Sequence, residues 1–105
     1  MQLIALFNLK PGVTAKQYED WARATDLPTV RQLPSIASFT VSRSLGLLGS
    51  DAAPPYQYVE IIEVADDKQF GLDVATPAMT AIAAQFQDLA DVIFLVTQSI
   101  ETAKA

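Results

Sequence analysis

Two segments at opposite ends of the sequence, 2–9 and 92–100, are largely apolar in both of their alternating sets of positions. A strand with one wet face alternates apolar and polar residues, whereas a strand covered on both faces is apolar almost throughout. Neither segment approaches the roughly 20 apolar residues that a membrane-spanning helix needs. The sequence therefore predicts two strands, one near each end of the chain, that are covered on both faces.

A helical segment is predicted directly after the first strand. Thr14, with Gln17 three residues later, forms a capping box, which marks the start of a helix. Pro28 disfavours helical geometry in the residue before it, so we expect this helix to end within residues 25–27. A short turn of helix is expected after the break, up to Pro34.

The middle of the chain is typical of a β-hairpin with a long connection. Residues 35–45 alternate cleanly between apolar and polar, and residues 56–64 form the next strand. The connection 46–55 contains glycines and prolines, and its length is typical of a lid or an interaction arm. Capping residues at Asp66 and Thr76 predict a second helical segment before the last strand.

The order strand–helix–strand–strand–helix–strand predicts one α+β domain over residues 1–105, with a ferredoxin-like four-stranded antiparallel sheet. Right-handed crossovers place both helices on the same face of the sheet and leave the other face bare. Because the two end strands are apolar in both alternating sets, the bare face is too apolar for a monomer. We therefore predict a homodimer joined through this face, a dimeric α+β barrel. The alternative is that the polar tail from Glu101 or the loop 46–55 covers the face within one chain.

Charge and composition narrow the classes of function. The net charge is −5 and basic residues form no cluster, so neither nucleic acid nor an anionic membrane is an expected partner. The start of the chain lacks the pattern of a signal peptide, so the cytoplasm is the expected location. The sequence has no Cys and no His, which excludes disulfides, thiolate nucleophiles, Ser–His–Asp catalysis and the usual haem ligand. No calcium-loop or glycine-rich phosphate-loop spacing is present, so no metal and no cofactor is expected.

Asp26 is the first candidate catalytic residue, because it follows Trp21 at the predicted break of the helix, where a side chain can face a cleft. A carboxyl enclosed by apolar neighbours holds its proton more tightly and can act as a general acid or base. Trp21 is a candidate wall of the same pocket. The alternative is that Asp26 forms an Asx turn or cap that organises Leu27 and Pro28.

Tyr58 and Glu60 share one face of the third predicted strand and are further catalytic candidates. A carboxylate in the centre of a strand either faces solvent or is committed to a partner. Glu60 is therefore expected either to pair with Arg43 on the neighbouring strand or to project into the pocket. Arg43 is itself a candidate ligand-binding residue.

The remaining candidates are polar residues that could hold a ligand. Ser38, Thr40 and Ser42 form a row of hydroxyl groups along one face of the second strand. This row either lines the polar wall of a cavity or lies on an edge strand that faces water. Asn8, at the end of the first strand, is a weaker candidate of the same kind.

Several stretches resemble the dimeric α/β-barrel superfamily, and more narrowly its RedY-like/HapK family, named from prodiginine pigment gene clusters. They are Phe7–Leu9, the helix with Tyr18 and Trp21, Thr25-Asp26-Leu27-Pro28 and Leu33-Pro34-Ser35-Ile36. The resemblance covers about the first hundred residues. It implies a ferredoxin-like barrel dimer with a pocket for a small apolar molecule, and a link to secondary metabolism that tailors or condenses pyrrole-containing intermediates. Many relatives in the superfamily carry a His at the end of the first helix, where this chain has Asp26.

The leading hypothesis is a cofactor-independent protein with a pocket for an apolar or aromatic molecule, acting as an enzyme. In this hypothesis Asp26 moves a proton, Tyr58 and the hydroxyl row hold a polar group, and Trp21 stacks on the ring of the ligand. One alternative is a binding or carrier protein that uses the same pocket without chemistry. Another is a structural dimer with a filled interior.

Overall fold

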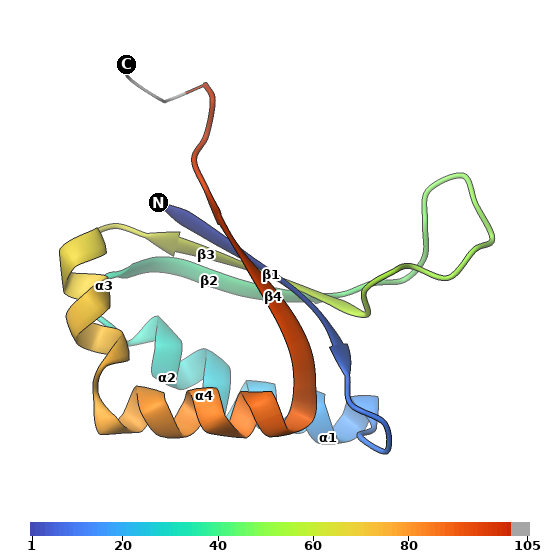
Figure 1. Cartoon of the computed structure of the whole chain (residues 1–105), viewed down its shortest axis with the longest axis horizontal. Helices are drawn as coiled ribbons and strands as arrows, with labels where there is room; N and C mark the ends of the chain where they lie inside the picture. Colours follow the sequence, from blue (N-terminus) through green and yellow to red (C-terminus); the bar gives the residue numbers. More distant parts are fainter. Residues whose placement is uncertain (102–105) are drawn as a thin grey trace.

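The computed structural model describes residues 1–101 and contains a four-stranded sheet with helices packed on one of its faces (Figure 1). The elements are β1 (Gln2–Leu9), α1 (Ala15–Trp21), the π-helix η1 (Ala22–Asp26), α2 (Leu27–Arg31), β2 (Ile36–Arg43), β3 (Tyr58–Val64), α3 (Asp67–Val74), α4 (Pro77–Leu89) and β4 (Ala90–Thr97). The strand order is β2-β3-β1-β4, and every neighbouring pair is antiparallel. This is the predicted α+β, ferredoxin-like arrangement.

Strand pairing explains where the observed strands differ from the predicted ones. β4 begins two residues earlier than expected, at Ala90, because Ala90 pairs with Leu9, the last residue of β1. It ends at Thr97, because Thr97 pairs with Gln2, the first residue of β1. β3 begins at Tyr58 rather than at residue 56. The N–H of Gln57 is shared between the carbonyl of Phe7 at 3.1 Å and the Asn8 side chain at 2.9 Å, so side-chain bonding joins the backbone ladder at this point.

The predicted caps begin the helices. The N–H of Gln17 donates to the Thr14 hydroxyl oxygen at 3.1 Å, and the N–H of Thr14 donates to the Gln17 side chain at 2.8 Å, which completes the capping box. Asp66 caps α3 and Thr76 caps α4 through their side-chain oxygens. These contacts span at most three residues, which is why the sequence alone predicts them.

The first helical segment ends at Asp26, within the predicted range, but the predicted break is a π-turn through which the chain stays helical. The N–H of Leu27 donates to the carbonyl of Ala22, five residues back, so the chain widens into a π-turn and remains helical. A proline inside a regular α-helix clashes with the carbonyl four residues before it. The wider turn relieves that clash. Pro28 then lies in the first turn of α2, where a backbone N–H is not needed for a hydrogen bond within the helix.

The core lies between the helices and the sheet. Leu3, Ala5 and Phe7 of β1 face the helices and are buried, as are the alternate residues of β3. An aromatic cluster around Phe7 and Tyr18 fills one end of this layer, and an aliphatic cluster around Phe39 fills the other. The predicted alternation of the strands is therefore the observed division between core and outer face.

The opposite face of the sheet carries no helix and is apolar at its centre. Strand register places Ile4 beside Ile61 and Leu95, and all three point away from the helices. Ile61 and Leu95 are exposed. Residues 98–101 leave the end of the sheet and Ile100 is almost fully exposed, so this stretch does not cover the face (Figure 1). The rest of the predicted polar tail, 102–105, lies outside the described residues.

Candidate functional site

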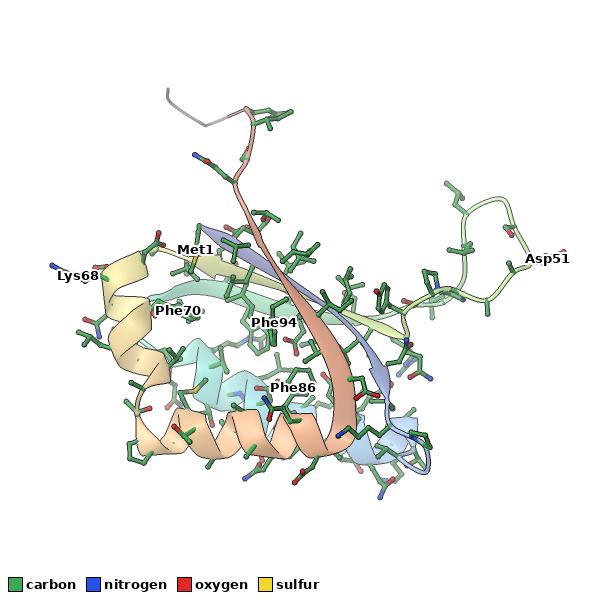
Figure 2. All side chains as sticks on the ribbon, viewed as in Figure 1. Met1, Asp51, Lys68, Phe70, Phe86 and Phe94 are labelled. Carbon is green, nitrogen blue, oxygen red and sulfur yellow. The ribbon has the colours of Figure 1, made fainter. Side chains whose placement is uncertain are left out.

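A cavity of about 170 Å³ lies between the helix-facing side of the sheet and the helices. Sixteen residues line it, and the only polar ones are Asp26, Glu60 and Gln87. Phe86 of α4 and Phe94 of β4 form part of its wall with their ring centroids 6.5 Å apart, and both lie between α4 and the sheet in Figure 2. The cavity is therefore an apolar space into which two carboxyl groups project.

Asp26 stands at the end of the π-helix, and its backbone explains why it faces the cavity. The π-turn widens the helix at this point, so that Ala22 and Asp26 both lie on the buried side. Asp26 is only 5% exposed, and this burial raises the pKa of its carboxyl to about 6. Its side chain makes no capping hydrogen bond at the start of α2, so the Asx-cap alternative is wrong.

Glu60 is the second carboxyl of the cavity, and it is 3% exposed. Its Oε2 atom has no hydrogen-bond partner in the described part of the chain. Burial, followed by the nearby charge of Asp26, raises the pKa of Glu60 to about 8. Neutralisation of the carboxyl by a proton is the expected response of an acid that is buried without a cation.

The expected pair between Glu60 and Arg43 is not formed. Strand register places Val41 opposite Glu60 and places Arg43 opposite Tyr58, one residue pair further along the ladder. Arg43 instead donates through Nε to Glu19 of α1 at 2.7 Å and through Nη2 at 2.5 Å. The guanidinium that would have neutralised Glu60 is therefore bound elsewhere.

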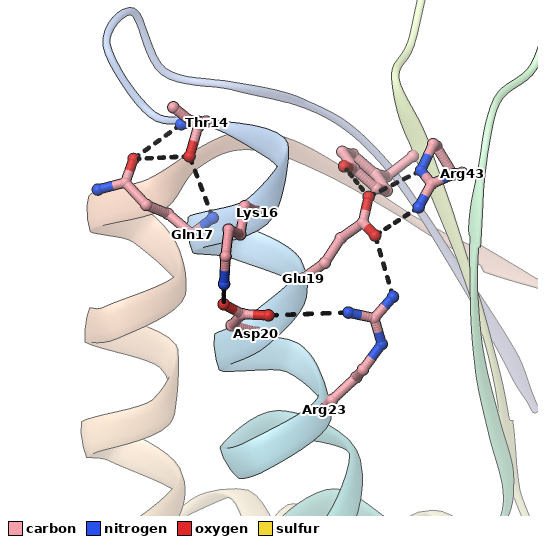
Figure 3. A network of polar contacts seen from close by, with 8 residues as sticks. Thr14, Lys16, Gln17, Glu19, Asp20, Arg23 and Arg43 are labelled. Atoms are coloured by element: carbon pink, nitrogen blue, oxygen red, sulfur yellow. Dashed lines mark hydrogen bonds and ion pairs between the residues drawn. The ribbon is translucent and has the colours of Figure 1, made fainter.

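Glu19 is the centre of a polar network that joins α1 to the edge of the sheet (Figure 3). It accepts hydrogen bonds from Arg43, from the hydroxyl of Tyr58 at 2.7 Å and from Arg23 at 3.1 Å. The hydrogen bonds from Arg43 and then from Tyr58 lower the pKa of Glu19 to about 2. The contact between Glu19 and Arg23 lies within one turn of helix, whereas those with Arg43 and Tyr58 join segments far apart in the sequence. Tyr58, a predicted catalytic residue, belongs to this network and does not line the cavity.

Tyr18 places a further polar group near the two carboxyls. The residue is fully buried, and its hydroxyl has no hydrogen-bond partner among residues 1–101. Burial raises the pKa of this hydroxyl, and the charges of Glu60 and then Asp26 raise it further, so the hydroxyl lies near both carboxyls. No signal in the sequence separates it from an ordinary core aromatic residue.

The predicted ligand-binding residues do not line this cavity. Trp21 lies behind its wall, where its ring stacks on Phe86 with centroids 6.0 Å apart and its Nε1 donates to Gln85 at 2.7 Å. The hydroxyl row lies on the helix-free face of an edge strand, as in the second of the two predicted alternatives, and Ser38 and Thr40 line a separate hollow with Arg31 and Ile36. The members of the row, Ser38, Thr40 and Ser42, are exposed.

Asn8 has a structural role at the base of the loop between β2 and β3. Its side chain accepts from the N–H of Gln57 and donates to the carbonyl of Pro55 at 3.0 Å. Asn8, Arg43 and Tyr58 line a separate hollow of about 540 Å³ beside this loop. The side chains of Asn8, Arg43 and Tyr58 are hydrogen-bonded to protein partners there, in contrast to Glu60 Oε2 of the apolar cavity.

The sequence matches the family described as REDY-like protein HapK over residues 1–100. The chain belongs to this family. The crystal structure of HapK from Hahella chejuensis matches with a TM-score of 0.75 and 29% identity, covering 100% of this chain and 98% of that one. No curated protein matches the sequence.

Two further solved structures share the HapK fold. SnoaB from Streptomyces nogalater, a cofactor-independent oxygenase, matches with a TM-score of 0.66 and 16% identity over 97% of this chain and 96% of its own. A dimeric ferredoxin-like protein of unknown function from Thermobifida fusca matches with a TM-score of 0.66 and 22% identity over 91% and 89%. At these identities the likeness is one of fold.

Two further properties of this HapK family member bear on its chemistry. In the part of the chain that the structure describes, no group of three or more acidic residues could hold a metal ion. Every helix within residues 1–101 is too short or too polar to span a lipid bilayer.

Proposed function

We propose that this protein binds a small apolar or aromatic molecule in the cavity and transfers a proton on it without a cofactor. The observation that carries the proposal is that Asp26 and Glu60 line one largely apolar cavity, and that no Lys or Arg is among the described residues that line it. Titratable groups with perturbed pKa values in a cleft are concentrated at active sites. The fold shared with a cofactor-independent oxygenase supports the enzymatic form of the proposal.

The two carboxyls are suited to opposite roles at neutral pH. With a pKa of about 6, Asp26 is mostly ionised and can accept a proton, whereas Glu60 with a pKa of about 8 is mostly protonated and can donate one. The protons are shared by a coupled pair. The substrate gives a proton to Asp26 and receives one from Glu60, and proton exchange with solvent restores the pair. The ionised and neutral forms together therefore supply an acid and a base.

The structure changes the set of residues assigned to this mechanism. Tyr58, Trp21 and the strand-two hydroxyls are left out, because they do not line the cavity. Tyr18 is added as a neighbouring hydroxyl group. The aromatic walls Phe39 and Phe86 take over the contact with an apolar ring. Membership of the HapK family supports a pyrrole-type intermediate of secondary metabolism as the ligand.

A model carbon acid tests the proposal without the natural substrate. We expect the protein to accelerate deuterium incorporation next to the carbonyl of cyclohexanone in D₂O, followed by proton NMR. Asp26→Asn should abolish the acceleration, whereas Glu63→Gln on the outer face should retain it. Absence of any acceleration by the unaltered protein would remove the enzymatic form of the proposal. The second candidate function, a binding or carrier protein without chemistry, would then remain, because the same cavity supports it.

We also propose that two copies of this single domain pair through the helix-free face in the cytoplasm. The apolar centre of that face, with Ile61, Ile93 and Leu95 exposed, supports this assembly. The dimeric ferredoxin-like protein from Thermobifida fusca shares the fold. None of the residues in the loop 46–55 lines the apolar cavity, and Leu48 in this loop is fully exposed. The loop is therefore proposed as an interaction arm rather than a lid.

A further inference from the structure

The apolar cavity carries acidic groups and no basic ones. Among its sixteen lining residues there is no Lys and no Arg. The arginines nearby are committed to other partners: Arg43 and Arg23 bind Glu19, and Arg31 donates two hydrogen bonds to the backbone carbonyl of Phe39. A carboxylate or a phosphate ligand would therefore meet two acids and no counterion. Such ligands are strongly disfavoured in a space of low polarity.

The two carboxyls also have unused capacity to accept hydrogen bonds. Glu60 is only 3% exposed, and its Oε2 atom has no hydrogen-bond partner within the described chain. The Asp26 side chain makes no cap, and burial is the cause of its raised pKa. Buried acceptors normally have donors, and an orphan acceptor that lines a cavity points to a ligand that supplies one.

The size and walls of the cavity set the shape of that ligand. A cavity of about 150 Å³ lined by apolar side chains is known to hold benzene, and this one measures about 170 Å³. Phe39, Phe86 and Phe94 contribute aromatic surface to it. A single ring therefore fits, with its polar edge toward the carboxyls.

We infer that the cavity selects an aromatic ring that carries a protonated nitrogen base, such as an amine or an amidine, and rejects ring carboxylates of the same shape. The inference deepens the proposed function and rests on the same cavity. A pyrrole nitrogen is not basic, so a pyrrole-type ligand meets the inference only where it carries a basic nitrogen outside that ring. The ligand nitrogen donates N–H bonds to Asp26 and Glu60, and its positive charge replaces the counterion that the protein does not provide. Hydrogen bonds between charged partners are about twice as strong as neutral ones, and a buried acid gains most from them.

Three probes of nearly identical shape separate the ligand charges: benzamidine is a cation, benzamide is neutral and benzoate is an anion. Calorimetry on the full chain should give benzamidine an affinity about tenfold or more above that of benzamide, the scale of one hydrogen bond to a charged group. Benzoate should not compete. Emission from Trp21, which stacks on the wall residue Phe86, gives a second readout.

Matched variants assign the preference to the carboxyls. Asp26→Asn should reduce the ratio of benzamidine to benzamide affinity to near one, whereas Glu63→Gln should leave it unchanged. Benzamidine should bind more tightly as the pH rises through 6 and Asp26 ionises. The groups that titrate beside it are Glu60 of β3 and Tyr18 of α1, while Arg31 of α2 bonds to the backbone.

Toluene as an apolar probe separates the two proposals. If toluene binds and benzamidine, benzamide and benzoate bind equally, the inferred preference for a nitrogen base is wrong, while the cavity remains a binding site. If neither toluene nor benzamidine binds, the small-molecule function proposed for the cavity is wrong as well. Preferential binding of benzoate would overturn the inference directly.

Discussion

Asp26 and Glu60 come from a π-helix and from β3, and they line the same cavity near enough that the charge of Asp26 raises the pKa of Glu60. Two acids that share an apolar space without a cation lower the stability of the fold when they are ionised. A protein that needed only a core would be more stable with apolar residues at both positions. The pair is therefore the clearest sign that this interior serves a ligand.

The first prediction concerns stability against pH. The folded pKa values of Glu60, about 8, and Asp26, about 6, lie above the usual carboxyl values. Between the usual and the raised values the folded chain holds more protons than the unfolded one, so the free energy of unfolding falls as pH rises. Each group contributes a slope of up to about 1.4 kcal/mol per pH unit. Urea denaturation between pH 5 and 8 should show this decline, and it should be shallower in Glu60→Gln. An identical slope in both proteins would contradict the assignment.

The second prediction concerns the pH dependence of proton transfer. The rate of cyclohexanone exchange should follow a bell-shaped profile, rising as Asp26 ionises near pH 6 and falling as Glu60 ionises near pH 8. Asp26→Asn should lower the maximum by about 10²-fold or more, the usual contribution of a positioned acid or base. Glu60→Gln should remove the alkaline limb. A monotonic profile in the unaltered protein would contradict the division of roles in which Asp26 is the base and Glu60 is the acid.

The third prediction concerns the network around Glu19. Glu19→Gln leaves Arg43 and the Tyr58 hydroxyl with weaker acceptors, so the free energy of unfolding should fall by about 1–3 kcal/mol at pH 7. Asp20→Asn is the control, because Asp20 pairs with Lys16 on the exposed side of the same helix. Exposed pairs contribute about 0–1 kcal/mol. Thermal unfolding followed by circular dichroism compares the two variants, and equal losses would argue against a structural role for Glu19.

The lowered pKa of Glu19 adds a pH dependence of opposite sign to that of the cavity. Its folded value of about 2 lies below the usual carboxyl value, so its contribution is complete above pH 4.5. That contribution is lost as the pH falls toward 2. Glu19→Gln should therefore cost most at neutral pH and little at pH 2, as acid titration of both proteins would show.

The fourth prediction concerns assembly. Ile61→Asp places a charge at the centre of the helix-free face and should convert the dimer into a monomer at micromolar concentration. Leu72→Asp is the control, since Leu72 is exposed as well, at 64% against 40% for Ile61, but lies on α3. Light scattering gives the mass of each. A single-chain mass for the unaltered protein would remove the proposed dimer.

Local sequence signals account for most of the predicted fold. The caps at Thr14, Asp66 and Thr76 and the alternation of the strands act over a few residues, so they are visible in the sequence and are confirmed. The boundary at Asp26 agrees with the preference of Pro28, but the π-turn that forms it is not visible in the sequence, because it keeps the chain helical. Burial of Ala22 and Asp26 on the same side decides that outcome, and it depends on the whole fold.

The site was predictable only in part for the same reason. Asp26 and Glu60 were found because a carboxyl at a helix break and a carboxyl within a strand are both unusual. The pairing of Arg43 failed because it depends on the register between β2 and β3, which places Arg43 opposite Tyr58. The hydroxyl row was placed correctly on one side of β2, but periodicity does not say which side holds a cavity. Tyr18 is not a sequence candidate, because only the fold brings its hydroxyl near Glu60 and Asp26.

The π-turn also affects how related chains can diverge. The sheet pairs its strands without any contribution from Ala22–Asp26, so removing one residue there would rotate a different side chain toward the interior and leave the β-ladder as it is. Loss or gain of a single codon can therefore exchange the acid of the cavity for another group in one step. Variation in loop and strand sequence is not required for a relative to acquire a new ligand.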